Sequence, residues 1–226
     1  MPDFFNQDMA KRYDARNSKL LAISDNLHFL VRLVLADLPA NARILCVGVG
    51  TGAEILSLAQ ARPGWTFVGV DPSSDMLNVC RDKLAQEGVA ERCELIAGYV
   101  QDAPVAPAFD AVLSILVAHF IPRTERRAFY RNVFERLKPD GYFVSAEISA
   151  DLDAAEFPAV LKNWAQVQAL MGATPDSLRN LEDTLRNALS VLSPADTVAL
   201  WRECGLNSPV QFFQAFMVRG WYARKP

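Results

Sequence analysis

Short apolar runs alternate with segments of helical spacing along most of this chain. The runs lie at 44–47, 66–70, 93–97, 109–117 and 142–149. A continuous apolar run is typical of a strand that is covered on both faces, as in a parallel sheet. Strands that alternate with helices in this way predict an α/β fold, in which a doubly wound sheet carries helices on both faces.

The tail of the chain shows a different pattern. Residues 209–225 are rich in aromatic and β-branched side chains and contain room for two more strands. No long connection separates these two strands, as a parallel crossover would require. We therefore expect an antiparallel pair at the end of the sheet.

Helical segments flank the strands at two places. Residues 1–40 are expected to cover the sheet, with Ser24 as the N-cap of a helix that ends before Pro39. A second helical stretch, residues 151–192, is too long for an ordinary connection. Its apolar side chains either pack only against the rest of the fold or close over an apolar substrate as a lid. We expect the lid, as part of a single domain that spans residues 1–226.

An amphipathic helix is predicted at 124–138, with four arginines largely on its outer face. Clustered arginines can bind phosphate, but acidic residues lie nearby, so a solvated helix face is the preferred interpretation. The arginines are Arg123, Arg126, Arg127 and Arg131.

Composition and charge narrow the choice of partner. The net charge of −3 gives no reason to expect nucleic acid or an anionic membrane. The first long apolar stretch is interrupted by His28, Arg32 and Asp37, so it predicts neither a signal peptide nor a membrane-spanning helix. We therefore expect a cytoplasmic protein. The four cysteines lack C-x-x-C spacing, so we expect no disulfide and no metal.

Candidate chemistry concentrates at Gly48, Gly50 and Gly52, between the first strand and a helix. Glycine here lets a ligand approach closely, and the unpaired amides of the helix point at that ligand. The second strand ends on Asp71, at the distance of roughly 20 residues expected for an acid that binds a ribose diol. The glycine spacing also fits the dinucleotide pattern, so adenosyl and nicotinamide cofactors both remain open. Alternatively, the glycines only close a tight turn and Asp71 caps the next helix.

Five motifs in this order resemble those of class I S-adenosylmethionine-dependent methyltransferases. The run 118–144 and the helical insert most resemble small-molecule methyltransferases and the carboxy-S-adenosylmethionine synthase group. The resemblance implies a seven-stranded Rossmann-like sheet, S-adenosylmethionine as cofactor and a small-molecule substrate, and it leaves a homodimer open. The motifs are ILCVGVGTG, FVGVDPSSDML, GYVQDAP, FDAVLSILVAHFI and ERLKPDGYFV.

The resemblance also implies a cofactor site. The three glycines would accommodate the methionine part, and Asp71 would accept hydrogen bonds from both ribose hydroxyls. The other expected contacts are Pro72 and Met76 on the adenine face, Tyr99, Val100 and Gln101 at its edge, Leu116, Val117 and Phe120 under the sulfonium, and Tyr13 closing over the cofactor. The chain departs from the family at two places. Cys46 stands where an acid usually orients the amino-acid end of the cofactor, and Gly98 is followed by Tyr99 and Val100 where the family often has Gly-Asp-Ala.

Methyl transfer from a sulfonium needs mainly alignment, so a general base is optional. His119 and Glu147 are the candidate bases; their simpler roles are packing near the cofactor and a carboxylate at the rim. The expected acceptor is small and partly apolar, lined by Phe157, Trp164 and Met171.

Two other functions stay open. A carboxy-S-adenosylmethionine synthase would need a basic side chain to hold a second carboxylate, and the insert offers Lys162, Arg179 and Arg186. A NAD-dependent oxidoreductase would use the same glycines and Asp71.

Overall fold

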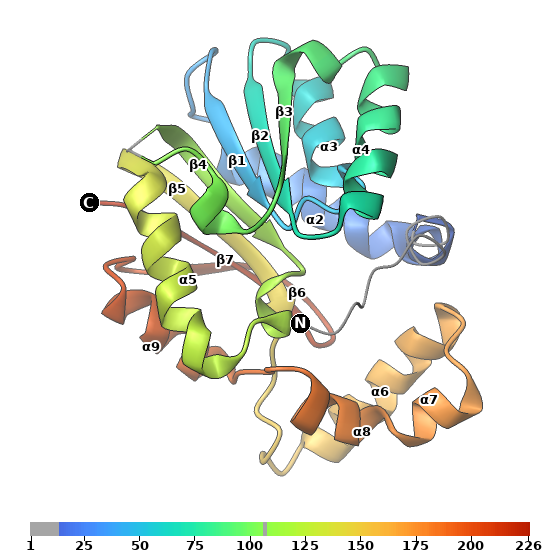
Figure 1. Cartoon of the computed structure of the whole chain (residues 1–226). Helices are drawn as coiled ribbons and strands as arrows, with labels where there is room; N and C mark the ends of the chain where they lie inside the picture. The colour runs from blue at the N-terminus through green and yellow to red at the C-terminus, as the bar shows by residue number, and fades with distance from the viewer. Residues whose placement is uncertain (1–13, 106–107) are drawn as a thin grey trace.

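The computed structural model describes residues 14–105 and 108–226, which fold around one seven-stranded sheet (Figure 1). The strand order is β3-β2-β1-β4-β5-β7-β6, and β7 runs antiparallel to both of its neighbours. This confirms the predicted α/β sheet with an antiparallel last strand. The strands are β1 Arg43–Val47, β2 Thr66–Asp71, β3 Cys93–Ala97, β4 Phe109–Ile115, β5 Leu137–Ile148, β6 Val210–Ala215 and β7 Val218–Arg224.

Helices cover both faces of the sheet, with α2, α3 and α4 on one side and α5 and α9 on the other (Figure 1). In the described ranges, no helix is both long and apolar enough to cross a bilayer. The longer helices are α2 Leu21–Val34, α3 Ala53–Ala61, α4 Ser74–Gln86, α5 Arg123–Arg136, α6 Phe157–Leu170 and α9 Pro194–Glu203. Shorter turns are η1 Ser18–Leu20, η2 Ala90–Arg92, η3 Val100–Asp102, η4 Ala118–Phe120, α7 Pro175–Arg179, α8 Leu181–Asp183 and η5 Thr184–Ala188.

Strand β1 shows why its apolar run is continuous. Ile44 and Cys46 pack in the core under α2, α3 and α4, which we call the first core. Leu45 and Val47 pack in the core under α5 and α9, the second core. Alternate side chains of a strand point to opposite faces, so a strand covered on both sides needs apolar residues at every position. Cys46 therefore faces the first core.

Two predicted helices differ in the structure. Helix α2 begins at Leu21, and the Ser24 hydroxyl donates to the Leu21 carbonyl at 3.3 Å, so Ser24 lies inside the helix and is not its N-cap. The insert, predicted as a helical stretch, is broken in its second half into α7, α8 and η5. Pro175 begins α7, and Asn180 separates α7 from α8.

The prediction of a solvated arginine face is wrong for Arg126, which is fully buried. Its guanidinium donates to Glu147 at 2.6 Å, to the Ile121 carbonyl at 3.1 Å and to the Ser190 carbonyl at 2.6 Å. Thr197 of α9 donates to the other oxygen of Glu147 at 3.2 Å. A buried guanidinium is tolerated because polar partners from the segment before α5, from β5 and from the insert satisfy it.

The insert leaves and rejoins the sheet at one stem. Ser149 and Leu192 form an isolated parallel bridge, and the Ser149 hydroxyl donates to the Leu192 carbonyl at 2.8 Å. Between these ends, Phe157 and Trp164 of α6 pack into the first core. The insert is thus held by its stem, by one apolar face of α6 and by Arg126.

We predict that Arg126→Met lowers the free energy of unfolding by about 3–5 kcal/mol at pH 7, because it leaves the Glu147 charge buried without a partner. Urea denaturation would measure the loss. The double variant Arg126→Met/Glu147→Gln should recover part of it, whereas simply additive losses would show that the two side chains do not act as a pair. The exposed Arg123 is the control, and Arg123→Met should cost less than about 1 kcal/mol.

Candidate functional site

The glycine turn, residues 48–52, folds over the end of β2 and is held there by hydrogen bonds. The amides of Gly48 and Val49 donate to the Val70 carbonyl at 2.8 and 3.1 Å. The Gly50 amide donates to Asp71 Oδ2 at 2.9 Å, and the Ser73 amide donates to Asp71 Oδ1 at 2.9 Å. Each carboxylate oxygen keeps a further lone pair, so Asp71 can still accept hydrogen bonds from a ligand diol.

Asp71 is fixed and largely dry. Its side chain is 8% exposed, and burial raises its pKa while the amides of Ser73 and Gly50 lower it. A carboxylate held by two backbone donors at the carboxyl end of a parallel strand lies where open α/β sheets bind ligands.

All three glycines of the turn have left-handed φ angles, of 67°, 53° and 84°. A Cβ on Gly48 would lie 2.3 Å from Val117 Cγ2, and one on Gly52 would lie 2.7 Å from Cys80 Sγ. At Gly50 a Cβ would meet just one described atom within 4 Å, at 3.4 Å. Gly48 and Gly52 are thus required by packing, and Gly50 leaves a more open face for a ligand.

The loop after β3 lies at the same edge of the sheet. The Tyr99 amide donates to Asp102 Oδ2 at 2.8 Å, and Arg136 of α5 donates to the Gln101 carbonyl at 2.8 Å. The Tyr99 and Gln101 side chains are exposed, whereas Val100 packs in the second core. At Val100, therefore, a ligand can meet only the backbone.

Of the two residues expected on the adenine face, Pro72 is exposed and Met76 is buried against the turn, where its Cε is the atom nearest a Cβ on Gly50. Leu116, directly after β4, has a φ of 60° and donates its amide to Ala146 at 2.6 Å. Together with Val117, it leads the chain past the glycine turn into η4, which contains Phe120.

Neither candidate base is placed for proton transfer. His119 is buried, and its Nδ1 accepts from the Ile148 amide at 3.3 Å. Burial, and then the charge of Arg126, lowers the pKa of His119 to about 3. Both oxygens of Glu147 are occupied by Arg126 and Thr197. A base must be free to reach its proton at a suitable pKa, so the geometry favours structural roles for both residues.

Several polar residues at the turn were missed from the sequence. Asp14 accepts from Thr51 Oγ1 at 2.7 Å and from Lys83 at 3.1 Å, which ties the amino-terminal segment to the glycine turn and to α4. Tyr13, expected to close over the cofactor, lies outside the described residues. Glu54 follows the turn and is buried, although an acid in the first turn of a helix is ordinarily exposed and interpreted as a partner of the helix dipole.

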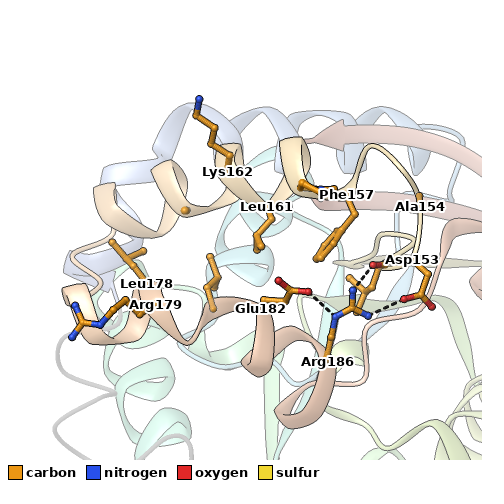
Figure 2. Close-up of a pocket in the computed structure, with 13 residues that line it drawn as sticks. Asp153, Ala154, Phe157, Leu161, Lys162, Leu178, Arg179, Glu182 and Arg186 are labelled. Atoms are coloured by element: carbon orange, nitrogen blue, oxygen red, sulfur yellow. Dashed lines mark hydrogen bonds and ion pairs between the residues drawn. The ribbon is translucent and has the colours of Figure 1, made fainter.

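The insert contains a cavity of about 660 Å³ between α6 and the α7–α8 segment (Figure 2). Apolar side chains form much of its wall, and Arg186 closes one side by binding Asp153 and Glu182 at 2.9 Å each. Arg179 and Lys162 also line the cavity; Arg179 pairs with Asp176, and the Lys162 amine points away from the other lining residues in Figure 2. The apolar wall residues are Leu152, Ala154, Phe157, Pro158, Leu161, Ala165, Leu178 and Leu181.

Of the three residues expected to line an acceptor site, Phe157 alone lines the cavity, with the Arg186 guanidinium 5.2 Å from the centre of its ring. Phe157 and Trp164 also pack in the first core, and Met171 lies against that core. A helix with apolar residues on two faces does not reveal from its sequence which face meets the core.

Comparison with known proteins matches both the central part of the chain and nearly its full length. Residues 44–141 match the family described as a methyltransferase domain. A carboxy-S-adenosyl-L-methionine synthase from Methylococcus capsulatus is 24% identical over 229 residues, covering 100% of this chain and 95% of that protein. A fatty-acid O-methyltransferase from Mycolicibacterium smegmatis is 31% identical over 158 residues, which cover 68% of this chain and 56% of that protein.

The fold comparison agrees. The solved structure of PigF with SAH has a TM-score of 0.67 and 20% identity, and the match covers 97% of this chain and 60% of that one. The domain match, the relatives and the strand order confirm the resemblance recognised from the five motifs. Residues 44–141 thus match a methyltransferase domain, and the chain resembles class I S-adenosylmethionine-dependent methyltransferases in sequence and in fold.

Proposed function

We propose that this protein transfers the methyl group of S-adenosylmethionine to a small, partly apolar metabolite. The observation that carries the proposal is the Asp71 carboxylate, held against the glycine turn by the amides of Gly50 and Ser73. It supplies a fixed acceptor for a ribose diol beside the open face of Gly50. The match of residues 44–141 to a methyltransferase domain supports an adenosyl cofactor over a nicotinamide one.

The residues of this site would bind and align, and no side chain is needed to activate the donor. When bound, S-adenosylmethionine supplies a methyl group already activated on its sulfonium. Met76 and Val117 pack around the glycine turn, and Asp14 holds the amino-terminal segment against it. Such packing excludes water and fixes the orientation of reactants, which by itself can supply much of the rate enhancement.

The insert is the proposed acceptor side. Its cavity has the size of a small-molecule site and a largely apolar wall. Arg179 and Arg186 are already paired with carboxylates, which favours an acceptor with little charge at this wall. A relative named for O-methylation of fatty acids supports an apolar acceptor.

A carboxy-S-adenosylmethionine synthase is the second candidate, because relatives of that name match nearly the whole chain. The paired arginines and the outward Lys162 offer it little support in the insert. Mass spectrometry of ligand released from the purified protein would separate the two. The carboxylated cofactor would favour the synthase, and S-adenosylhomocysteine, the product of methyl transfer, would favour the methyltransferase.

We predict micromolar binding of S-adenosylhomocysteine, measured by calorimetry. Asp71→Ala should weaken it by about 1.5–3 kcal/mol, the usual range for a lost hydrogen bond to a charged group. Glu125→Ala, which removes an exposed acid from the first turn of α5, is the matched control and should bind as the wild type does. Heat with NAD and none with S-adenosylhomocysteine would contradict the proposed cofactor.

We also predict that Leu161→Trp, which fills the cavity of the insert, slows methyl transfer at least tenfold without changing the affinity for S-adenosylhomocysteine. The assay would follow labelled methyl groups from S-adenosylmethionine to a panel of phenols, medium-chain alcohols and carboxylic acids. Leu170→Trp is the control, since Leu170 is exposed on the same helix and does not line the cavity. Full activity of Leu161→Trp would place the acceptor elsewhere.

A further inference from the structure

Glu54, the second residue of α3, is a buried carboxylate beside the glycine turn. Its side chain is 7% exposed. Within residues 14–105 and 108–226 no cation forms an ion pair with it. Lys83, whose charge does reach it, donates instead to Asp14 at 3.1 Å and to Thr51 at 3.4 Å. An unpaired buried carboxylate is costly, and such groups concentrate at functional sites.

Among the described groups around Glu54, Lys83 alone is positively charged, and it is paired with Asp14. Asp71 faces it from β2, Cys46 from β1, and Cys80 and Lys83 from α4. Burial raises the pKa of Cys46 well above its ordinary value and that of Cys80 to about 12, so both thiols are neutral. Burial is the largest effect and, with the charge of Asp71, raises the pKa of Glu54 to about 8. The hydrogen bond from its own backbone amide and the charge of Lys83 lower this pKa, but by less. In the free protein Glu54 therefore carries a proton at neutral pH.

We propose that Glu54 binds the ammonium group at the amino-acid end of the cofactor. The inference rests on the proposed function, and it is motivated by position: Glu54 lies two residues after the turn that leaves room for a ligand, and the neighbouring Cys46 thiol carries no charge. When the ammonium arrives, the carboxylic acid releases its proton to solvent and the resulting carboxylate pairs with the ammonium, which keeps its own protons. The pair then replaces a buried neutral acid with a charge-assisted hydrogen bond.

Binding should therefore release a proton and become tighter as pH rises. Below a pH of about 8 the free protein must give up the Glu54 proton, so affinity should increase up to tenfold per pH unit and level off above that value. Folding stability has the opposite dependence. Because the folded-state pKa is raised from 4.5 to about 8, Glu54 destabilises the free protein increasingly between those values.

Calorimetry in buffers of different ionisation enthalpy, at pH 6.5 to 8, tests this by counting protons. The ligands are S-adenosylhomocysteine, which has the ammonium, and 5′-methylthioadenosine, which lacks the amino-acid end. We expect wild-type protein to release a proton with the first ligand and none with the second. Glu54→Gln should release none, bind S-adenosylhomocysteine at least tenfold more weakly at pH 8, and bind 5′-methylthioadenosine unchanged.

Glu125→Gln is the matched control, because Glu125 also lies in the first turn of a helix, but is exposed. It should behave as the wild type does with both ligands. Without ligand, Glu54→Gln should melt at a higher temperature than wild type at pH 8 and at the same temperature at pH 4.

The failures are distinguishable. If wild-type protein binds neither ligand, the proposed function fails, and this inference fails with it. If it binds S-adenosylhomocysteine without proton release, only the role of Glu54 is overturned. Equal weakening of both ligands by Glu54→Gln would also overturn it, since a merely structural acid would affect both. The proton count uses the wild type, so the test holds even if the variant is unstable.

Discussion

The site depends on one carboxylate that joins the turn after β1 to the start of α4. Asp71 accepts from Gly50 on one oxygen and from Ser73 on the other. The backbone of the glycine turn that makes this contact is left-handed at all three glycines. Val117 packs against Gly48 and Cys80 packs against Gly52, which leaves no room for a side chain at either position. Because the turn sets where α3 begins, the same contact also fixes the position of Glu54 and the free amides of that helix.

A second polar network orders the other side of the strand ends. Arg126 and Glu147 connect α5, β5, the insert and α9 in the dry interior. The same environment keeps His119 neutral. The two candidate bases thus belong to the frame of the protein, which agrees with a reaction that relies on alignment.

The strands could be predicted because each buried run is apolar throughout, and Asp71 ends β2 as expected. The burial of Arg126 had a signal in its spacing, since Arg126, Phe129, Tyr130 and Val133 share the inner face of α5 at helical intervals. That signal was outweighed by the three other arginines of the cluster. The burial of Glu54 could not be predicted, because it depends on how α4 and the amino-terminal segment pack beside the turn. For the same reason, tertiary contacts alone decide which face of α6 meets the core.

The stem formed by Ser149 and Leu192 makes the insert a replaceable module. Its two ends already touch, so the entropic cost of closing the segment between them changes only slowly with its length. Residues can be added to or removed from that segment without shifting β5, α9 or the glycine turn, provided that the apolar face of α6 and the contact of Ser190 with Arg126 are kept. Related chains could therefore diverge in what they modify while the donor side stays the same, and acceptor preference could be exchanged between them by grafting one continuous segment.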